Sequence, residues 1–275
     1  MLHEIPYRRA AMLLVLAGLG FLTLAASHDS KAPAIGAAIS GQDPGKTSEI
    51  STDELRIILL SGSATVFDAR PPAEYGMGHI PGARNVAPKP GVPLSEYVSD
   101  AAEIGRVVKG DKKAPIVLYC NGPFCGKSKR LADELVQAGF TNVRRYQLGI
   151  PVWRALGGPC EMSFQAFWNI LQKDQTAVVI DAREVADYKA LSLPGSRNIP
   201  RSLVLEGKDV GEIKKAKDDG RLPMEDHNTR IIVLASDGAS ARYVAGALTY
   251  EAFHNVSFLE GSFAQTKAAG DSLSK

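Results

Sequence analysis

Strand-like and helix-like hydrophobic patterns alternate along most of the chain. Short apolar runs, each bounded by turn residues, stand at positions 64–67, 116–119, 177–180 and 231–234. Runs of this length between turn residues are typical of buried strands. After the second run, Leu131, Leu135 and Val136 fall on one face of a helix that the following Gly139 would end. This alternation predicts an α/β fold in which mostly parallel sheets carry helices on both faces.

The pattern occurs twice. Asp68-Ala-Arg70 recurs as Asp181-Ala-Arg183, and the segment 81–85 recurs at 194–198 with the same offset. A constant offset over separate motifs indicates an internal duplication. We therefore expect two homologous domains, a first repeat at 50–158 and a second repeat at 162–272. The capping pattern Ser51-x-x-Glu54 predicts a short helix at the start of the first repeat.

The region before the repeats has a different character. Arg8 and Arg9 precede an apolar run at 10–26, and small residues follow it. This order is typical of a secretory signal, so residues 1–27 are predicted to be a signal peptide or an uncleaved membrane anchor. Residues 28–49 are rich in Gly, Ala, Ser and Pro and are predicted to be a flexible linker. We expect an exported protein, periplasmic or anchored at the outer face of the inner membrane, which touches the membrane only through this leader.

Composition narrows the function classes. Hydrophobic residues make up 45% and charged residues 23% of the 275 positions, as in ordinary globular proteins. The net charge of +2 gives no reason to expect a nucleic-acid partner. His79 has no partners at metal-ligand spacing, so we expect no metal and no other cofactor. Three cysteines are an odd number, so at least one thiol is free or pairs with another molecule.

Candidate chemistry gathers around Cys120, which directly follows the apolar run at 116–119. In open α/β sheets, ligands bind beyond the carboxyl ends of the strands. The loop after it, here called the cysteine loop, consists of Asn121, Gly122, Pro123, Phe124, Cys125, Gly126, Lys127 and Ser128. Its glycines and the following helix end predict backbone amides converging on an ionised sulfur, which suits both a nucleophilic thiolate and a persulfide. The alternative is an inert buried cysteine. In the second repeat Ala235 stands in place of Cys120, so that repeat is expected to be inactive.

The motifs of the first repeat resemble the rhodanese family. The resemblance rests on Asp68-Ala-Arg70, on Glu74-Tyr75, on the segment from Gly78 to Asn85 and on Tyr119-Cys120 before a glycine-containing loop. It is weaker in the second repeat, where Asp187 and Ser192 replace Glu74 and His79. The family consists of thiosulfate and mercaptopyruvate sulfurtransferases. Because both repeats resemble it, the resemblance implies two rhodanese-like domains. It also implies that Cys120 accepts a sulfane sulfur and passes it to a thiophilic acceptor.

This chain departs from the common family pattern in three ways. Tandem members usually keep the cysteine in the second copy. The cysteine loop is longer than the usual form and contains Cys125. Glu74 stands near a position where tandem members acting on thiosulfate tend to carry an arginine. A carboxylate there would disfavour a small dianion, so thiosulfate, mercaptopyruvate and polysulfide all remain candidate donors.

The other residues have simpler interpretations. Asp68 and Arg70 either support substrate at a strand end or, as we favour, fix the following turn. His79 is expected to bond backbone groups of its own turn. Cys125 is either a resolving thiol that forms a disulfide with Cys120 or a packing residue of the loop. Cys160 is expected to be a bystander in the connection between the repeats.

Three functions follow from these expectations. The first is an exported sulfurtransferase that works through a Cys120 persulfide. The alternatives are a sulfur carrier or partner-binding module without turnover, which would need a partner protein, and a redox thiol protein built on Cys120 and Cys125. Phosphatases that use a related loop carry an arginine six residues after the cysteine, where this chain has Gly126.

Overall fold

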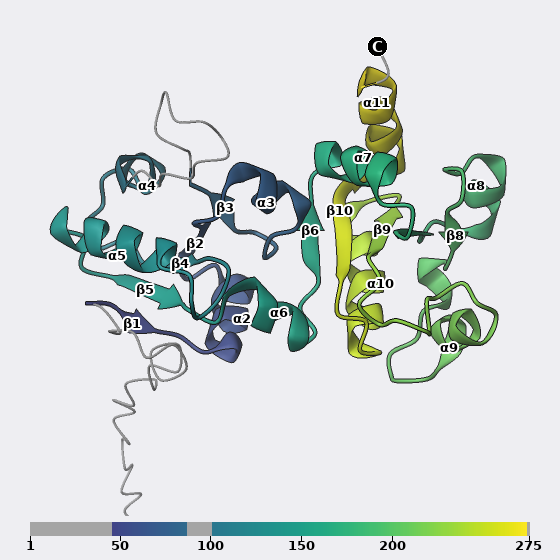
Figure 1. Ribbon diagram of the computed structural model, residues 1–275, viewed down its shortest axis with the longest axis horizontal. Coiled ribbons are helices and arrows are strands. Elements are labelled where there is room, and N and C mark those ends of the chain that lie inside the picture. The colour runs from purple at the N-terminus through teal and green to yellow at the C-terminus, as the bar shows by residue number, and fades with distance from the viewer. Residues whose placement is uncertain (1–45, 87–100, 274–275) are drawn as a thin grey trace, which may run out of the picture. The chain divides into compact units, whose positions relative to one another are not determined.

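The computed structural model describes residues 46–86 and 101–273, which form two parallel β-sheets (Figure 1). The first sheet has the strand order β1-β5-β4-β2-β3 and the second has the order β6-β10-β9-β7-β8. Each position in one order corresponds to the equivalent element of the other repeat. The described part of the chain therefore confirms the predicted duplication and the α/β class.

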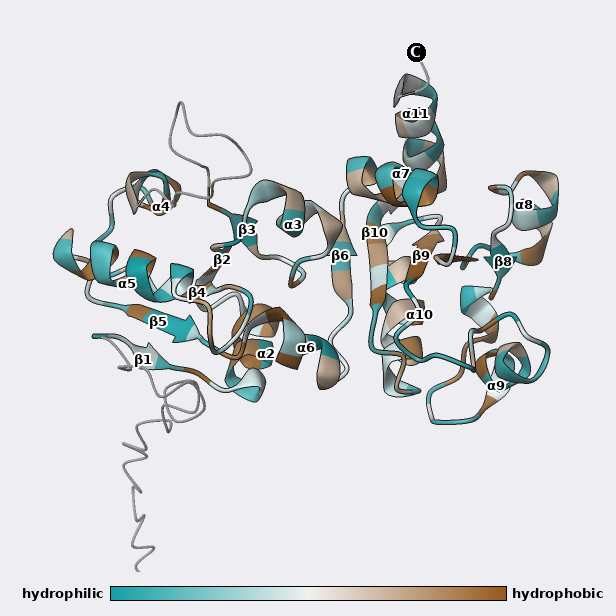
Figure 2. Ribbon diagram, viewed as in Figure 1, coloured by the Kyte–Doolittle hydropathy of each residue, from teal (hydrophilic) through white to brown (hydrophobic). Residues whose placement is uncertain are grey.

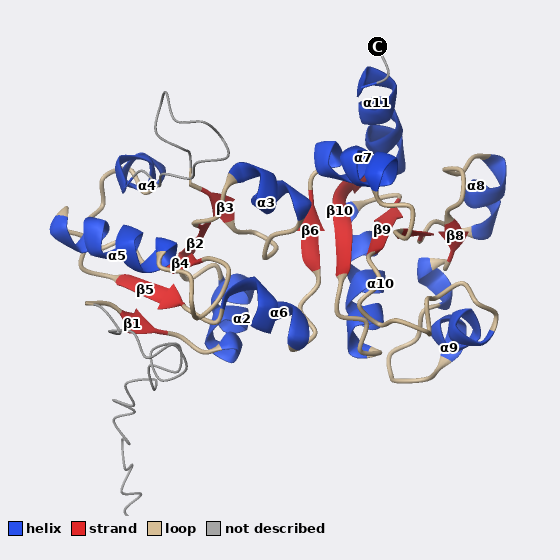
Figure 3. Cartoon of the chain, viewed as in Figure 1, coloured by secondary structure: helices blue, strands red, loops and turns tan. Residues whose placement is uncertain are grey.

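The elements of the first repeat alternate between strand and helix, as the colours of Figure 3 show. Its strands are β1 (Ser48–Glu49), β2 (Thr65–Asp68), β3 (Arg84–Asn85), β4 (Ile116–Tyr119) and β5 (Val143–Tyr146). Its helices are α2 (Thr52–Ser61), α3 (Pro72–Met77), α4 (Ala101–Val107), α5 (Lys127–Gln137) and α6 (Gly149–Ala155).

The second repeat has the same order of elements. Its strands are β6 (Cys160–Met162), β7 (Val178–Asp181), β8 (Arg197–Asn198), β9 (Ile231–Ala235) and β10 (Val256–Ser262). Its helices are α7 (Phe164–Lys173), α8 (Val185–Ala190), the 3-10 helix η1 (Arg201–Leu203), α9 (Gly211–Asp218), α10 (Gly238–Tyr250) and α11 (Phe263–Leu273).

Alternating side chains of the first sheet supply a core on each face. Leu118 and Cys120 pack on one face against α4 and α5, in a cluster that also contains Leu131. Val117 and Tyr119 point to the other face and join residues of α2 and α6. Because successive residues of a strand face opposite sides, one strand feeds both clusters. Figure 2 shows the resulting hydrophobic colouring of the central strands. The sheet is thus covered by helices on both faces, as the unbroken apolar runs predicted.

The second sheet is built in the same way. One cluster joins β7, β9 and β10 to α9 and α10, and Val233 and Leu248 belong to it. The other cluster lies on the opposite face and includes Leu234 with residues of α7. Both repeats therefore bury two cores, one above and one below a five-stranded sheet.

Local signals explain where individual helices start and stop. Ser51 caps α2: its Oγ accepts from the amide of Glu54 at 3.1 Å, and Glu54 Oε2 accepts from the amide of Ser51 at 2.9 Å. This reciprocal capping box is the one that the sequence predicted. Gly139, expected to end α5, adopts a φ of +88°, a conformation that favours glycine.

Two predicted boundaries are wrong. Residues 48 and 49, assigned to the linker, form edge strand β1 and pair with Arg144 and Arg145 of β5. Cys160, assigned to the connection, begins β6 and pairs with Ser257 of the second sheet. Both strands are too short to carry a hydrophobic period, so their pairing depends on tertiary contacts.

The predicted leader at 1–27 and most of the predicted linker lie outside the described residues. Within the ranges that are described, none of the helices combines the length and the apolar character needed to cross a bilayer.

Candidate functional site

Cys120 lies where the sequence placed it, at the carboxyl end of the central strand β4. Its carbonyl oxygen accepts from the amide of Ile150 at 3.2 Å, which ties the strand end to α6. The side chain points to the face covered by α4 and α5 and is only 1% exposed. The position suits a ligand site of an open α/β sheet, but the sulfur itself is buried.

Cys120 forms a disulfide with Cys125, and the Cα atoms of the two residues lie 6.4 Å apart. Of the two interpretations of Cys125, the structure therefore shows the disulfide partner. Cys160 is the third cysteine, buried and outside this disulfide. In this oxidised form Cys120 has no thiolate, and the chemistry expected of it requires prior reduction.

The surroundings of the Cys120 sulfur differ from the expected ring of amides. Its Sγ lies 3.3 Å from the carbonyl oxygen of Cys125 and 3.4 Å from Oγ of Ser128, which is fully buried. The predicted arrangement belonged to a negatively charged sulfur. A disulfide sulfur carries no such charge for amides to stabilise.

Gln147 holds the cysteine loop in shape, and the sequence analysis missed it. Its Nε2 donates to the carbonyl oxygens of Pro123 at 3.1 Å and Cys125 at 3.2 Å, with Gly122 at 3.4 Å. Gln147 is itself buried and directly follows β5, the strand next to β4. A polar residue at the carboxyl end of a neighbouring strand was the signal that could have revealed this contact.

Arg145 in turn fixes Gln147. Its Nη1 donates to Oε1 of Gln147 at 2.5 Å, its Nε donates to Thr47 at 2.9 Å, and its Nη2 pairs with Glu49 at 3.2 Å. Arg145 is 1% exposed, so these bonds form away from solvent. They connect the edge strand β1 to the cysteine loop through one buried polar chain.

The rest of the loop faces outward in part. Gly122 has a φ of +107°, which favours glycine, and the amide of Cys125 donates to its carbonyl at 2.9 Å. Asn121 donates through Nδ2 to Oε2 of Glu74 at 2.5 Å, and the side chain of Phe124 is 70% exposed. The loop predicted to reach Ser128 ends at Gly126, because Lys127 and Ser128 already belong to α5.

The two repeats differ at the helix that follows this strand end. In the second repeat, Asp237 caps α10 and accepts from the amide of Ser240 at 2.8 Å. Within the described part of the first repeat, Gly126 precedes α5 without a capping side chain, and the first turn of α5 has no acidic residue. The start of α5 is therefore not capped by a carboxylate side chain, whereas the start of α10 is capped by that of Asp237.

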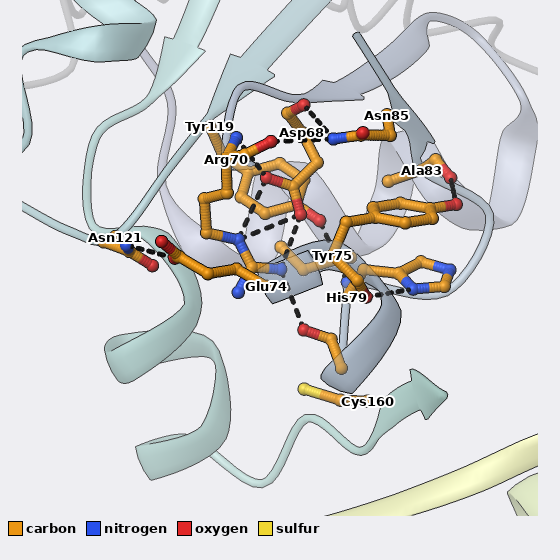
Figure 4. A network of polar contacts seen from close by, with 12 residues as sticks. Asp68, Arg70, Glu74, Tyr75, His79, Ala83, Asn85, Tyr119, Asn121 and Cys160 are labelled. Atoms are coloured by element: carbon orange, nitrogen blue, oxygen red, sulfur yellow. Dashed lines mark hydrogen bonds and ion pairs between the residues drawn. The ribbon is translucent and has the colours of Figure 1, made fainter. Parts of the chain in front are cut away.

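Asp68 and Arg70 form a buried structural pair (Figure 4). Nε of Arg70 donates to both carboxylate oxygens of Asp68 at 3.0 Å, and Nη2 donates to the carbonyl of Gly78 at 2.8 Å. Asn85 donates to the carbonyls of both Asp68 and Arg70. Asp181 and Arg183 repeat the pairing in the second repeat, where Ala235 replaces Cys120. The favoured structural interpretation of Asp68 and Arg70 is thus supported.

His79 bonds backbone, as expected, and also meets a carboxylate. Its Nδ1 lies 3.0 Å from the carbonyl of Tyr75, and its ring stacks on that tyrosine. Its Nε2 lies 3.5 Å from Oε1 of Glu161. Burial alone would raise the pKa of Glu161, but the hydrogen bond and charge of His79 hold this pKa below its usual value.

Two tyrosines near Asp68, Tyr75 and Tyr119, have raised pKa values that keep them neutral. Burial, followed by the nearby carboxylates of Glu161 and Asp68, raises the pKa of Tyr75 to about 12. Burial is also the main cause that raises the pKa of Tyr119 well above its ordinary value, with Asp68 adding to it. Tyr119 Oη accepts from the amide of Ile80 at 3.1 Å. These tyrosines lie at the turn after β2 rather than at the sulfur of Cys120.

Residues 46–86 and 101–273 contain no group of three or more side chains suited to a metal ion.

The second repeat lacks the parts of this site. Ala235 ends β9, and only residues 236 and 237 separate it from α10, against residues 120–126 between β4 and α5. At the repeat offset, Glu260 stands in place of Gln147. A carboxylate cannot donate to loop carbonyls as the amide does.

Comparison with known proteins accounts for both repeats. A sequence model of the rhodanese-like domain matches residues 51–156 and again residues 163–269. The HTH-type transcriptional regulator Rv0324 of Mycobacterium tuberculosis is 35% identical over 101 residues, which cover 37% of this chain and 39% of the regulator. The thiosulfate sulfurtransferase GlpE of Pseudomonas paraeruginosa is 27% identical over 99 residues, which cover 36% of this chain and 76% of GlpE. The match thus spans less than half of the regulator's length.

Solved structures give more distant likenesses. A crystal structure of a thiosulfate sulfurtransferase from Pseudomonas aeruginosa is 21% identical with a TM-score of 0.33, covering 79% of this chain and 42% of that one. The wild-type structure of EanB is 20% identical with a TM-score of 0.36, covering 82% of this chain and 61% of EanB.

Proposed function

Because the chain belongs to the rhodanese-like family, we propose that it is a sulfurtransferase that moves a sulfane sulfur through a persulfide on Cys120. The observation that carries the proposal is the position of Cys120, at the carboxyl end of β4 and ahead of the uncapped helix α5. The second repeat keeps the fold but has Ala235 at the equivalent strand end. Sulfur chemistry therefore belongs to the first repeat.

The reaction has two displacement steps at one sulfur atom. Reduced Cys120 attacks the sulfane sulfur of the donor; with thiosulfate, sulfite leaves and a persulfide remains on the protein. A thiophilic acceptor such as cyanide then attacks the outer sulfur, and the Cys120 thiolate leaves. The positive end of the α5 dipole favours the anionic sulfur in both states, and Ser128 supplies a hydroxyl beside it.

Glu74 bears on the choice of donor. Its carboxylate is bonded to Asn121, the first residue after Cys120, and so adds negative charge beside the loop. We infer that a donor with less charge than the thiosulfate dianion, such as mercaptopyruvate, is used better. Comparing both donors in the wild type and in Glu74→Gln tests this point, because the variant should gain more with thiosulfate.

The decisive assay is thiocyanate formation from cyanide with thiosulfate, mercaptopyruvate or polysulfide as donor, after reduction of the protein. We expect turnover by the wild type and none by Cys120→Ser, and intact mass should show one added sulfur atom on Cys125→Ser, in which Cys120 has no disulfide partner, before cyanide is supplied. Failure to form thiocyanate with every donor, together with no added sulfur on Cys120, would reject the proposal.

The disulfide favours one competing function, a redox thiol protein built on Cys120 and Cys125. Such a protein would cycle between dithiol and disulfide without ever carrying sulfane sulfur. Mass spectrometry of reduced Cys125→Ser after donor treatment separates the two functions, because this variant can hold sulfane sulfur on Cys120 but cannot close the disulfide. A sulfur carrier that is loaded only by a partner protein would instead acquire sulfur in a cell extract but not from small donors.

We further propose that the protein acts outside the cytoplasm, at the periplasmic side of the inner membrane. Support comes from the arginines and the apolar run within residues 1–27. Cell fractionation, with the N-terminal residue of the mature protein determined by mass spectrometry, tests export and separates a cleaved signal from an anchor. Recovery in the cytoplasm with an intact leader would contradict it.

A further inference from the structure

The double displacement uses one cysteine, yet the loop contains two. Cys125 lies within disulfide reach of Cys120, and the equivalent loop of the second repeat has neither residue. Cys125 is half-buried and joins the partly buried rim of the cluster that includes Cys120. Its place in the loop has no function in the reaction described above.

The fold holds the two sulfurs together independently of the bond between them. The turn from Gly122 to Cys125 is closed by a backbone hydrogen bond of 2.9 Å, and Gly122 has the positive φ that the turn needs. Gln147 fixes the carbonyl oxygens of Pro123 and Cys125. None of these bonds involves a sulfur atom, so reduction leaves Cys125 beside Cys120 at a high effective concentration.

We propose that Cys125 is an internal resolving thiol that discharges the Cys120 persulfide, releases hydrosulfide and closes the disulfide seen in the structure. The inference rests on the proposed function, because it requires sulfane sulfur on Cys120. It assigns the protein a further activity, the reductive release of sulfide without any external acceptor.

The atoms and electrons of this step balance between the two cysteines and one leaving group. Sγ of Cys125 gives up its proton and attacks Sγ of Cys120, the inner sulfur of the persulfide. The new bond joins the two cysteine sulfurs, while the bond from Cys120 to the outer sulfur breaks. The outer sulfur takes the electron pair and the proton and leaves as hydrosulfide. The sulfane sulfur is thereby reduced, the two cysteine sulfurs are oxidised, and an external dithiol must reopen the disulfide before the next cycle.

Attack on the inner sulfur is the direction that the structure supports. Attack on the outer sulfur would move the persulfide to Cys125 and form no bond between the two cysteines. The disulfide in the structure is the bond that attack on the inner sulfur, Sγ of Cys120, would form. Because both sulfurs belong to one short loop with fixed carbonyls, this attack competes with any acceptor that must diffuse in from solution.

The test is a single turnover of the reduced full chain, kept free of oxygen and of external thiols. Thiosulfate or mercaptopyruvate is added in less than stoichiometric amount, released sulfide is trapped, and intact mass is recorded. We expect the wild type to release one sulfide per sulfur received and to end two hydrogens lighter than the reduced protein. Cys125→Ser should keep the added sulfur and lose sulfide release. Cys160→Ser, a matched control for a buried cysteine outside the loop, should behave as the wild type.

The outcomes separate this inference from the function on which it rests. Thiocyanate formation by Cys125→Ser shows that the variant is folded and that Cys120 transfers sulfur. If that holds while the wild type also retains its sulfur, or if Cys125→Ser releases sulfide as fast as the wild type, the resolving role is overturned and sulfur transfer stands. If no variant takes up sulfur or forms thiocyanate, the proposed function fails and the resolving role fails with it.

Discussion

The sulfur of Cys120 has two oxygen neighbours that offer different things to an anion. The carbonyl of Cys125 can only accept a hydrogen bond, whereas the hydroxyl of Ser128 can donate one. When the thiol is reduced and ionised, Ser128 is therefore the neighbour that stabilises it. The same hydroxyl can follow the negative charge when that charge moves to the outer sulfur of a persulfide.

Replacing Ser128 by alanine should slow persulfide formation by about 2- to 10-fold, since one hydrogen bond contributes about 0.5–1.5 kcal/mol. The pH profile of Cys120 alkylation should move to higher pH, because the ionised sulfur loses a donor. The control is Ser240→Ala, which removes a hydroxyl bonded to Asp237 in the second repeat. An unchanged alkylation profile in Ser128→Ala would show that the hydroxyl does not bond the thiolate.

Gln147 acts through the loop backbone. In Gln147→Glu, one oxygen still accepts from Arg145, but the other replaces the donor that held the carbonyls of Pro123 and Cys125. We expect about a tenfold loss of sulfur transfer, equivalent to about 1.4 kcal/mol, and faster hydrogen exchange of the loop amides. The free energy of unfolding should change less, because the new carboxylate pairs with Arg145. Gln165→Glu, on the exposed face of α7, should leave both measurements unchanged.

Among the elements, the helices that follow β4 and β9 in the two repeats start differently. The second repeat places the carboxylate of Asp237 at the start of α10, and the first repeat leaves the start of α5 to Gly126. A carboxylate at a helix start contributes about 0.3–1 kcal/mol to stability. The first repeat forgoes that contribution, and the positive helix end stays available to an anionic sulfur.

Gly126→Asp should therefore raise the free energy of unfolding by about 0.3–1 kcal/mol while lowering sulfur transfer. The side chain has room, since an added Cβ would meet nothing within 4 Å and the φ of −79° suits any residue. Gly126→Ala controls for the loss of glycine. Chemical denaturation and the thiocyanate assay measure the two effects. If Gly126→Asp and Gly126→Ala were equally active, the helix end would have no part in binding the sulfur.

The elements differ in how far the sequence determines them. The buried strands β2, β4, β7 and β9 were predictable because each is an apolar run between turns, and α2 because Ser51 and Glu54 cap it. Edge strands β1 and β6 were not predictable, since two or three residues carry no period and pair only through their neighbours.

Only part of the candidate site was predictable from the sequence. Cys120 follows from strand position alone, but the bond to Cys125 was one of two open interpretations. Gln147 is marked in the sequence only by its position after the strand next to β4, and the loop carbonyls that it bonds are set by tertiary packing.

In the whole molecule, the duplication distinguishes residues that support the fold, which occur in both repeats, from residues proposed for sulfur chemistry, which occur in one. The buried pair of Asp68 and Arg70 recurs in the second repeat as Asp181 and Arg183. Breaking a buried pair by removing one partner is costly, so selection for folding is enough to keep both copies. In the second repeat Ala235 and Glu260 stand in place of Cys120 and Gln147, and the shorter loop has no cysteine. The cysteine loop is thus the specialised part of an otherwise duplicated fold.

Beside that structural pair, Tyr75 makes stability depend on pH at the alkaline end. Its pKa lies at about 12 in the folded protein against an ordinary value of 10.0. Between these values the unfolded chain loses the phenolic proton while the folded chain keeps it. The unfolded state then binds fewer protons, so stability falls as pH rises through this window and is constant with respect to this group below it.

Urea denaturation midpoints across the window should therefore decline less steeply in Tyr75→Phe than in the wild type. The variant also loses the bond that Tyr75 donates to the carbonyl of Ala83, so its midpoint below this window should be lower than that of the wild type. Tyr250→Phe, at an exposed position, should keep the wild-type slope. Equal slopes for Tyr75→Phe and the wild type would mean that the folded protein does not hold the Tyr75 proton more tightly than the unfolded chain.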